Sequence, residues 1–227
     1  MSISSQSSEA QLRQELCLVG RSLFERGYVH GTTGNISVRV PGQEGGFLIT
    51  PTDACLGFLA PDRLALVDEQ GQQLSGDRAS KTLALHRRIY QHAPNAGCVI
   101  HTHSTGLVEL TLRGVWRTDD IVPPLTPYFV MKVGHVPLVP YFRPGDARVA
   151  DHVGQLIDAY RARDLSLRAV MCDRLGPQVW GSDLIATMAV LEELEETARL
   201  WLRSDRQAQP LAEAAIEECR QYFKASW

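Results

Sequence analysis

The 227-residue chain has no apolar run close to the ~20 residues that cross a bilayer. Its first residues, MSISSQSSEAQLRQE, are polar and contain no apolar segment of the kind that a secretory signal needs. Lys and Arg total 23 against 26 Asp and Glu, a net charge of -3, and no basic cluster occurs, which argues against a dedicated nucleic-acid binder. These absences predict a cytoplasmic protein that binds neither membranes nor nucleic acids.

Cysteine is scarce and widely spaced. The five cysteines (Cys17, Cys55, Cys98, Cys172 and Cys219) are an odd number and include no CxxC pair. This pattern favours reduced thiols, several of them buried as small apolar side chains. The hydrophobic fraction of 44% and the charged fraction of 22% are ordinary for a globular protein, and the sequence shows no repeat or linker.

Helical and strand-like patterns alternate along the chain. We expect one α/β domain over residues 9–227, preceded by a disordered N-terminus over residues 1–8. Apolar residues at helical spacing predict helices within 9–27, 81–94, 104–114, 146–163 and 182–204. Alternating or short apolar runs predict strands within 36–40, 47–50, 66–76, 98–103 and 167–181, the last as two strands around a Gly-Pro turn. The Pro-rich segment 122–144 is expected to contain short extended pieces.

The motif His101-Thr102-His103 follows the apolar strand residues Cys98–Ile100. Side chains two residues apart in a strand point to the same side, so both imidazoles can reach one ion. Neutral imidazole is a common ligand of zinc and neighbouring divalent metals. Because zinc takes three or four protein ligands, two histidines do not complete a site. Because two histidines at this spacing often occur by chance, the motif alone favours a metal centre less than it favours a chance pair, although its place at the end of a strand strengthens the metal interpretation.

Three further loops carry small or hydroxyl-bearing residues at the ends of predicted elements. They are Gly31-Thr32-Thr33-Gly34-Asn35, Thr50-Pro51-Thr52 and Ser80-Lys81. Loops of this kind offer backbone N–H groups and side-chain donors to an anion. On local grounds a plain turn is the better interpretation of the first loop, and each loop alone is a weak signal. They gain meaning only if the fold gathers them around one pocket.

The sequence contains several blocks in the order and spacing of the class II aldolase/adducin-head family. The blocks are HGTTGNISVRV, FLITPTDACLGFL, LSGDRASKTLALHRRIYQHAPNAGCVIHTHST, GPQVWG and LEELEETARL. The resemblance covers roughly residues 10 to 205. Within the family, TPYFVMKVGHVPLVPYFRPGD is most similar to the branch that contains 3-oxo-tetronate 4-phosphate decarboxylase, and fuculose-phosphate aldolase is a more distant relative.

This resemblance implies a central, mostly antiparallel sheet flanked by helices, assembled as a homotetramer with active sites between subunits. It also implies a divalent metal, zinc first and iron or manganese next, held by three histidines. The metal would stabilise an enediolate after a C–C bond breaks. A glutamate beside the metal would move the proton, and phosphate would lie among neutral loops.

Individual residues match the positions that carry these roles. His101 and His103 match the two strand histidines of the metal site, and Tyr128 roughly matches a tyrosine that lies near the substrate in aldolases, although an interface aromatic is nearly as good an interpretation. Lys81 fits the decarboxylase branch, where a Ser/Thr-Lys pair precedes the acidic residue. The candidate substrate-binding residues are Thr33, Gly34, Asn35, Thr50, Thr52, Ser80, Lys81 and Arg143.

Three residues depart from the family pattern at the centre of the chemistry. Leu175 stands where the third histidine belongs, and its isobutyl group has no lone pair. Thr82 stands at the position of the catalytic glutamate, and a neutral hydroxyl cannot replace a carboxylate base. Asp53 replaces a glycine of the second phosphate loop, where its charge would repel a phosphate unless Lys81 or an arginine offsets it.

Replacement residues can be named for the lost groups. His135 is the first candidate for the third metal ligand, with His30 and Asp173 as further candidates. Tyr128, Lys81 and Thr82 are the candidate catalytic residues. The remaining histidines, His86, His92 and His152, are expected to be packing or surface residues.

Three functions remain open on these residues. The first is a metal-dependent lyase that cleaves or decarboxylates a small oxo-acid or sugar acid, with Arg143 or Lys81 binding its carboxylate or phosphate. The second is a family member recruited to different chemistry on an unphosphorylated substrate, either iron- and oxygen-dependent or metal-free. The third is a non-catalytic scaffold of the adducin type.

Overall fold

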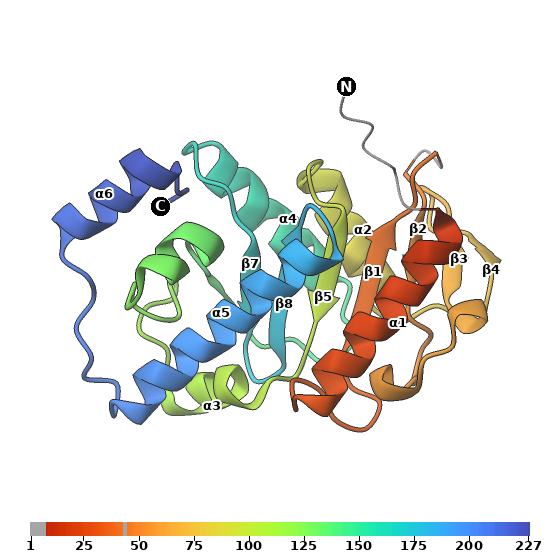
Figure 1. The fold of residues 1–227 in the computed structure, drawn as a ribbon, viewed down its shortest axis with the longest axis horizontal. Helices are drawn as coiled ribbons and strands as arrows, with labels where there is room; N and C mark the ends of the chain where they lie inside the picture. The colour runs from red at the N-terminus through yellow and green to blue at the C-terminus, as the bar shows by residue number, and fades with distance from the viewer. Residues whose placement is uncertain (1–7, 43–44) are drawn as a thin grey trace.

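An eight-stranded sheet forms the centre of the protein, and helices cover both of its faces (Figure 1). The computed structural model describes residues 8–42 and 45–227. The strand order is β4-β3-β2-β1-β5-β8-β7-β6, and all neighbours are antiparallel except the parallel pair β6 and β7. The strands are β1 (Asn35–Arg39), β2 (Phe47–Ile49), β3 (Ala65–Val67), β4 (Gln73–Ser75), β5 (Cys98–His101), β6 (Leu138–Val139), β7 (Ala169–Cys172) and β8 (Gly176–Gly181). The prediction of an α/β domain with a mostly antiparallel sheet is confirmed.

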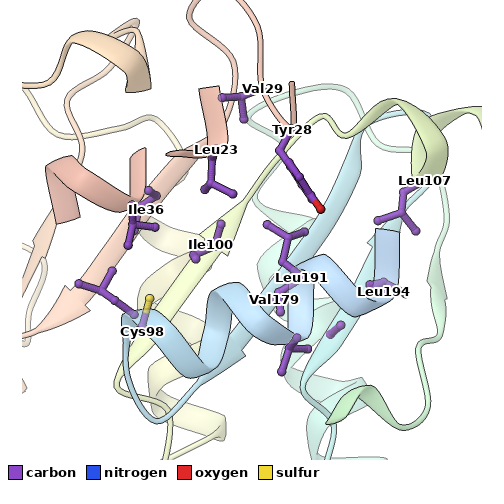
Figure 2. Packing of buried hydrophobic residues seen from close by; sticks show 14 of the residues in the cluster. Leu23, Tyr28, Val29, Ile36, Cys98, Ile100, Leu107, Val179, Leu191 and Leu194 are labelled. Atoms are coloured by element: carbon purple, nitrogen blue, oxygen red, sulfur yellow. The ribbon is translucent and has the colours of Figure 1, made fainter. Parts of the chain in front are cut away.

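The helices divide between the two faces of the sheet. The main ones are α1 (Glu9–Glu25), α2 (Leu83–His92), α3 (Thr105–Arg113), α4 (Arg148–Arg161), α5 (Leu184–Arg203) and α6 (Glu213–Phe223). Helices α1, α3 and α5 share one apolar core with the sheet, whereas α2 and α4 share the other. Figure 2 shows the first core, where Ile36, Ile100 and Val179 of three neighbouring strands lie among Leu23, Leu191 and other helix residues.

Alternation along the strands separates apolar from functional positions. On β5, Cys98 and Ile100 belong to the first core, whereas Val99 belongs to the second. His101 follows the same alternation and therefore lies on the face that carries α2 and α4. The sheet thus places the predicted histidine motif at the end of its central strand, on the side of those two helices.

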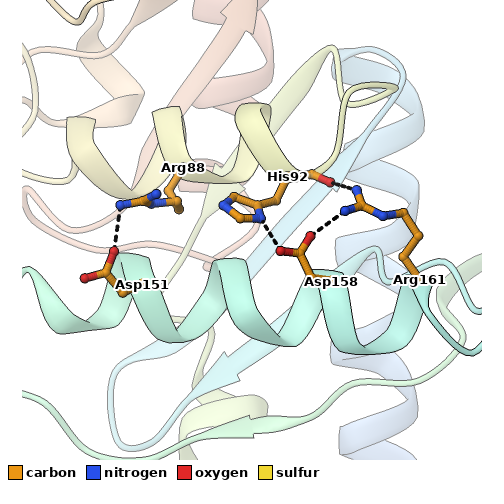
Figure 3. Close-up of polar contacts among 5 residues, drawn as sticks. All are labelled: Arg88, His92, Asp151, Asp158 and Arg161. Carbon is orange, nitrogen blue, oxygen red and sulfur yellow. Dashed lines mark hydrogen bonds and ion pairs between the residues drawn. The ribbon is translucent and has the colours of Figure 1, made fainter.

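Polar contacts hold α4 against α2 on that face (Figure 3). Arg88 pairs with Asp151 at 2.6 Å, and His92 and Arg161 both contact Asp158, at 2.8 and 2.6 Å. Because α4 begins directly after the loop 140–147, these contacts fix the helix that anchors that loop. His92 therefore lies in the contact between α2 and α4, in agreement with the packing role expected for it.

The ends of α1 refine the predicted boundaries. Residues 1–7 of the predicted disordered N-terminus lie outside the described residues, and Ser8 caps α1. The Ser8 hydroxyl accepts a hydrogen bond from the Gln11 backbone N–H, and the Gln11 side chain accepts one from the Ser8 N–H. This reciprocal capping box satisfies two N–H groups that a free helix end would leave unpaired. Ser8, the last residue of the predicted N-terminal segment, is therefore the N-cap of α1.

Other local expectations differ from the structure. The segment 122–144 contains a π-helical turn, Phe129–Val133, as well as the expected extended pieces. Gly176 and Pro177 lie inside β8 and not in the turn, which is formed by residues 173–175. Helix α6 was not predicted and packs Ile216 and Cys219 against Val130 of the π-helical turn. Within the described residues, no helix is long and apolar enough to cross a membrane.

Candidate active site

Three polar side chains form a row across the central strands. His101 of β5 lies directly opposite Asn35 of β1 on one side and Gln178 of β8 on the other. Directly opposite residues of antiparallel strands share a face, with Cβ atoms about 4.5–5.5 Å apart. The row therefore faces α2 and α4, at the edge where the predicted loops begin.

The two motif histidines meet at their Nε2 atoms, which are 3.1 Å apart. The Nδ1 atom of His101 lies 2.8 Å from the carbonyl oxygen of Pro177. A carbonyl can only accept, so Nδ1 carries the proton and the Nε2 lone pair of His101 is free to accept from His103. Two nitrogens bound to one zinc at ~2.0–2.1 Å lie about 3.3 Å apart in tetrahedral geometry. The pair therefore fits two positions around such a cation.

Burial keeps these imidazoles neutral, which is their metal-binding form. It lowers the pKa of His101 to about 3, with the neighbouring charge of His103 adding to the effect. The pKa of His103 is lowered as well, by burial first and by His30 second. A neutral imidazole coordinates a cation through its unprotonated nitrogen, so His101 is ready to bind through Nε2, whereas His103 would bind through Nε2 in the tautomer that carries its proton on Nδ1.

A third ligand of the usual type does not join the pair. Among the residues that the structure describes, no group of three His, Cys, Asp or Glu side chains could hold a metal ion. The exposed His30 ring lies edge-on to His103 with centroids 6.3 Å apart, and Asp173 lines the cavity that His101 lines. Leu175 also lines that cavity, at the position where the resemblance expects a histidine.

The structure does not bring His135, the first candidate for the third ligand, to the histidine pair. Its Nδ1 atom lies 2.8 Å from the Asp120 carboxylate, and its ring stacks on Trp227 with centroids 4.4 Å apart. Tyr160 lies on a further side of the ring, at 5.8 Å. The backbone beside His135 is bound to the same carboxylate, because the Val136 N–H also donates a hydrogen bond to Asp120. Both contacts hold the His135 ring between Asp120 and Trp227.

The predicted phosphate loops do converge. The Thr50 hydroxyl accepts from the Ile36 N–H at 3.2 Å, which joins the second loop to the first strand. The Thr50 carbonyl accepts from the Ser80 N–H, and an isolated bridge pairs Pro51 with Ala79, which joins the second loop to the third. Thr52 continues this contact through its N–H to the Arg78 carbonyl.

Gly34 explains how the first loop packs so closely on the histidine strand. Its φ is +81°, and a Cβ atom there would lie 2.9 Å from the His101 carbonyl oxygen. Only glycine adopts this conformation at this approach without strain. The Thr33 hydroxyl closes the same turn by donating to the His30 carbonyl at 2.6 Å.

A buried hydrogen-bond chain orients Asn35. The Asn35 side-chain oxygen can only accept, so His86 donates to it from Nε2, at 2.5 Å. His86 Nδ1 then accepts from the Ser37 hydroxyl at 2.7 Å, and Ser37 accepts from Tyr90 at 2.8 Å. Burial lowers the pKa of His86 to about 3, so the ring stays neutral. His86 is a packing residue, as predicted, and no partner for the Asn35 NH₂ group lies among the described residues, so this group is available to a ligand.

Lys81 offsets the unusual aspartate of the second loop. Its Nζ atom lies 3.2 Å from both carboxylate oxygens of Asp53, and both side chains are mostly exposed. Asp53 has a φ of +55°, in the left-handed region that favours glycine. That backbone conformation gives a physical reason for the glycine that the resemblance expects there.

A cavity of about 140 Å³ opens beside the row. Lys81, Thr82, His101, Arg143, Leu175 and Gln178 line it. Asp146 and Asp173 line it too, and Asp146 pairs with Arg148 at 2.8 Å. Arg143 forms no ion pair with the residues that the structure describes, so its charge is available to a ligand.

Tyr128 lies elsewhere on the subunit. It precedes the π-helical turn, is 63% exposed and lines a depression with Glu192, Glu193 and Lys132. Within one subunit it therefore does not join the cavity that contains His101.

Gln178 is the site residue that sequence reasoning missed. Its side chain is 1% exposed, and no partner lies within hydrogen-bond distance of its Oε1 atom among the described residues. A buried acceptor without a partner costs about 1–3 kcal/mol. The one available signal was a polar residue inside the otherwise apolar strand GPQVWG.

Comparison with known proteins gives a consistent assignment. A 3-oxo-tetronate 4-phosphate decarboxylase from Cupriavidus necator is 50% identical over 97% of this chain and its own full length. An L-fuculose phosphate aldolase from Methanocaldococcus jannaschii is 31% identical over 84% of this chain and 95% of its own. The solved structure of YgbL from Klebsiella pneumoniae, described as an aldolase, epimerase or decarboxylase, has a TM-score of 0.86, 41% identity and coverage of 94% of this chain and 100% of its own.

These relatives confirm the predicted resemblance, including the decarboxylase branch, and support a class II aldolase-like lyase. The family described as the Class II Aldolase and Adducin N-terminal domain matches residues 14–202. The chain therefore belongs to the class II aldolase and adducin family.

Proposed function

We propose that this protein is a decarboxylase of a phosphorylated 3-oxo sugar acid. The observation that carries the proposal is the cavity that combines His101 with the cations Lys81 and Arg143. The activity named for the 50% identical relative supports the substrate class. Such a substrate carries two anionic groups and a ketone, and the cavity and the adjoining loops offer groups for each.

The two anionic ends of the substrate would bind to different parts of the site. Arg143 would bind the carboxylate, since its guanidinium donates two parallel hydrogen bonds and has no competing ion pair among the described residues. The free NH₂ group of Asn35 and the joined loops of Thr50 and Ser80 would bind the phosphate. The positive charge of Lys81 would offset the negative charges of both Asp53 and the phosphate.

Decarboxylation suits a site that lacks the family's glutamate. In a 3-oxo acid the C1–C2 bond breaks, carbon dioxide leaves, and the bonding pair forms a C2=C3 enolate that then takes a proton at C2. No base has to remove a hydroxyl proton first, whereas aldol cleavage needs that step. Thr82 at the glutamate position is therefore compatible with decarboxylation, and its hydroxyl is held by Ser80 at 3.0 Å.

The neutral pair His101 and His103 would hold a divalent cation, zinc first and iron or manganese next. When bound, this cation supplies Lewis-acid stabilisation of the enolate oxygen. The residues of the chain orient the pair, with the Pro177 carbonyl fixing the His101 ring. The Gly34 turn keeps the phosphate loop against the same strand.

Assembly and location complete the proposal. We propose a cytoplasmic homotetramer in which the exposed Tyr128 of one subunit faces the site of a neighbour, as its resemblance to an aldolase tyrosine suggests. The absence of Tyr128 from the cavity of its own subunit supports that arrangement.

The test is carbon dioxide release from 3-oxo-tetronate 4-phosphate by purified protein. We expect turnover without oxygen, a large loss with Arg143→Ala, and little change with the control Arg220→Ala, since neither Arg220 nor its ion-pair partner Glu217 lines the cavity. Turnover of only the unphosphorylated acid, or a requirement for oxygen, would favour the recruited chemistry instead. No turnover of either acid would leave the scaffold function.

A further inference from the structure

We infer that the Gln178 side-chain oxygen is the third protein ligand of the cation that His101 and His103 hold. This inference deepens the proposed function and rests on it for the presence of a cation. It assigns to Gln178 the role that Leu175 has lost.

The sheet places Gln178 where such a ligand is needed. Gln178 is directly opposite His101 in the β5–β8 ladder, so the two side chains leave the same face side by side. Pro177, the residue before Gln178, supplies the carbonyl that orients the His101 ring at 2.8 Å. The ligand and its orienting group would thus come from consecutive residues of one strand.

The chemistry of the side chain points the same way. Gln178 Oε1 is buried and has no partner among the described residues, and the side chain lines the cavity that His101 also lines. A buried carbonyl oxygen requires a hydrogen-bond donor or a cation. Amide carbonyl oxygens are accepted ligands of divalent metals.

The other nearby groups do not meet this need. Leu175 has no lone pair, and no third His, Cys, Asp or Glu completes a group with the pair within residues 8–42 and 45–227. A site of two imidazoles and one amide is neutral. It should therefore bind a divalent cation more weakly than the same site with a carboxylate in place of the amide.

The test is a titration of the full-length protein with Co²⁺, followed by the visible absorption of the bound ion and by the dissociation constant. Gln178→Leu removes the oxygen at similar size, and we expect 10- to 100-fold weaker binding with a changed spectrum. Gln178→Glu restores an oxygen and should bind at least as tightly as the natural protein. The control Leu175→Val alters the same cavity without changing any donor and should stay within about twofold, a change worth only ~0.4 kcal/mol.

Two results would overturn the inference. One is a Gln178→Leu protein that is folded by circular dichroism and binds Co²⁺ with the natural affinity and spectrum. The other is a natural protein that takes up no Co²⁺ at all. Carbon dioxide release is measured separately. If the natural protein releases carbon dioxide but Gln178→Leu leaves the Co²⁺ affinity unchanged, only the ligand assignment is refuted. Loss of Co²⁺ affinity in Gln178→Leu without turnover by the natural protein would refute only the proposed function.

Discussion

Acid should destabilise this protein through His86, the buried ring that orients Asn35. Burial lowers the pKa of His86 from 6.5 to about 3 in the folded state. Above pH 6.5 the ring is neutral in both states and contributes nothing to the pH dependence. Below pH 6.5 the unfolded chain binds a proton that the folded protein excludes, so stability falls until the pH reaches about 3.

The size of the effect follows from the pKa difference. At pH 4.5 the unfolded ring is two pH units below its pKa, whereas the folded ring is still neutral. Each unit is worth about 1.36 kcal/mol, so His86 alone removes about 2.7 kcal/mol from the free energy of unfolding. His101, whose folded pKa is also about 3, adds a loss of the same sign.

A matched variant isolates His86 from the other titrating groups. Gln in His86→Gln does not titrate, and it keeps an N–H donor for Asn35 and an oxygen that can accept from Ser37. We would measure urea unfolding of both proteins by tryptophan fluorescence at pH 7.5 and 4.5, at one protein concentration. The stability advantage of the natural protein should shrink by about 2.7 kcal/mol between the two pH values. An unchanged difference would show that burial does not hold His86 neutral.

Three further substitutions test the geometry of the site. Leu175→His places a third imidazole in the cavity and should tighten Co²⁺ binding at least ~10-fold, and unchanged affinity would mean that this side chain does not face the pair. Asp53→Gly removes a negative charge at a φ of +55°, so inorganic phosphate should raise the melting temperature more than in the natural protein, and a smaller rise would contradict this reasoning. Gly176→Ala would put a Cβ atom 1.9 Å from the Thr102 carbonyl oxygen and should cost more than ~2 kcal/mol in thermal denaturation. The control Gly27→Ala, at a φ of +76° with open space, should lose only ~1 kcal/mol, and equal losses would refute the close contact.

Sequence patterns predicted most of the fold because its elements are strongly periodic. Helix α5 has a long apolar stripe after Asp183, whose side chain caps the helix by accepting from the Ala186 N–H. The π-helical turn over Phe129–Val133 was missed because five residues are too few to show a helical period. Helix α6 was not predicted although its 11 residues exceed the 10 of α2 and the 9 of α3, both of which were.

The site was predictable only in its local parts. The spacing of His101 and His103 predicts that both can reach one ion, since two-residue spacing in a strand fixes the side. The third position could not be resolved in this way, because His135, His30 and Asp173 all looked suitable from their positions in the chain. How far each of these side chains lies from the histidine pair depends on long-range packing. His135, for example, packs against Asp120 and Trp227 and does not join the pair.

By itself, the sequence determined the family, because several motif blocks occur in the family's order and spacing. That resemblance implied the mostly antiparallel sheet and the loss of a ligand at Leu175, whereas the pairing of His101 and His103 follows from their spacing alone. Only the tertiary structure joined the Thr50 and Ser80 loops and set Gln178 beside His101. Strand register decides which residues are neighbours across a sheet, and register is set by the packing of whole strands rather than by any one segment.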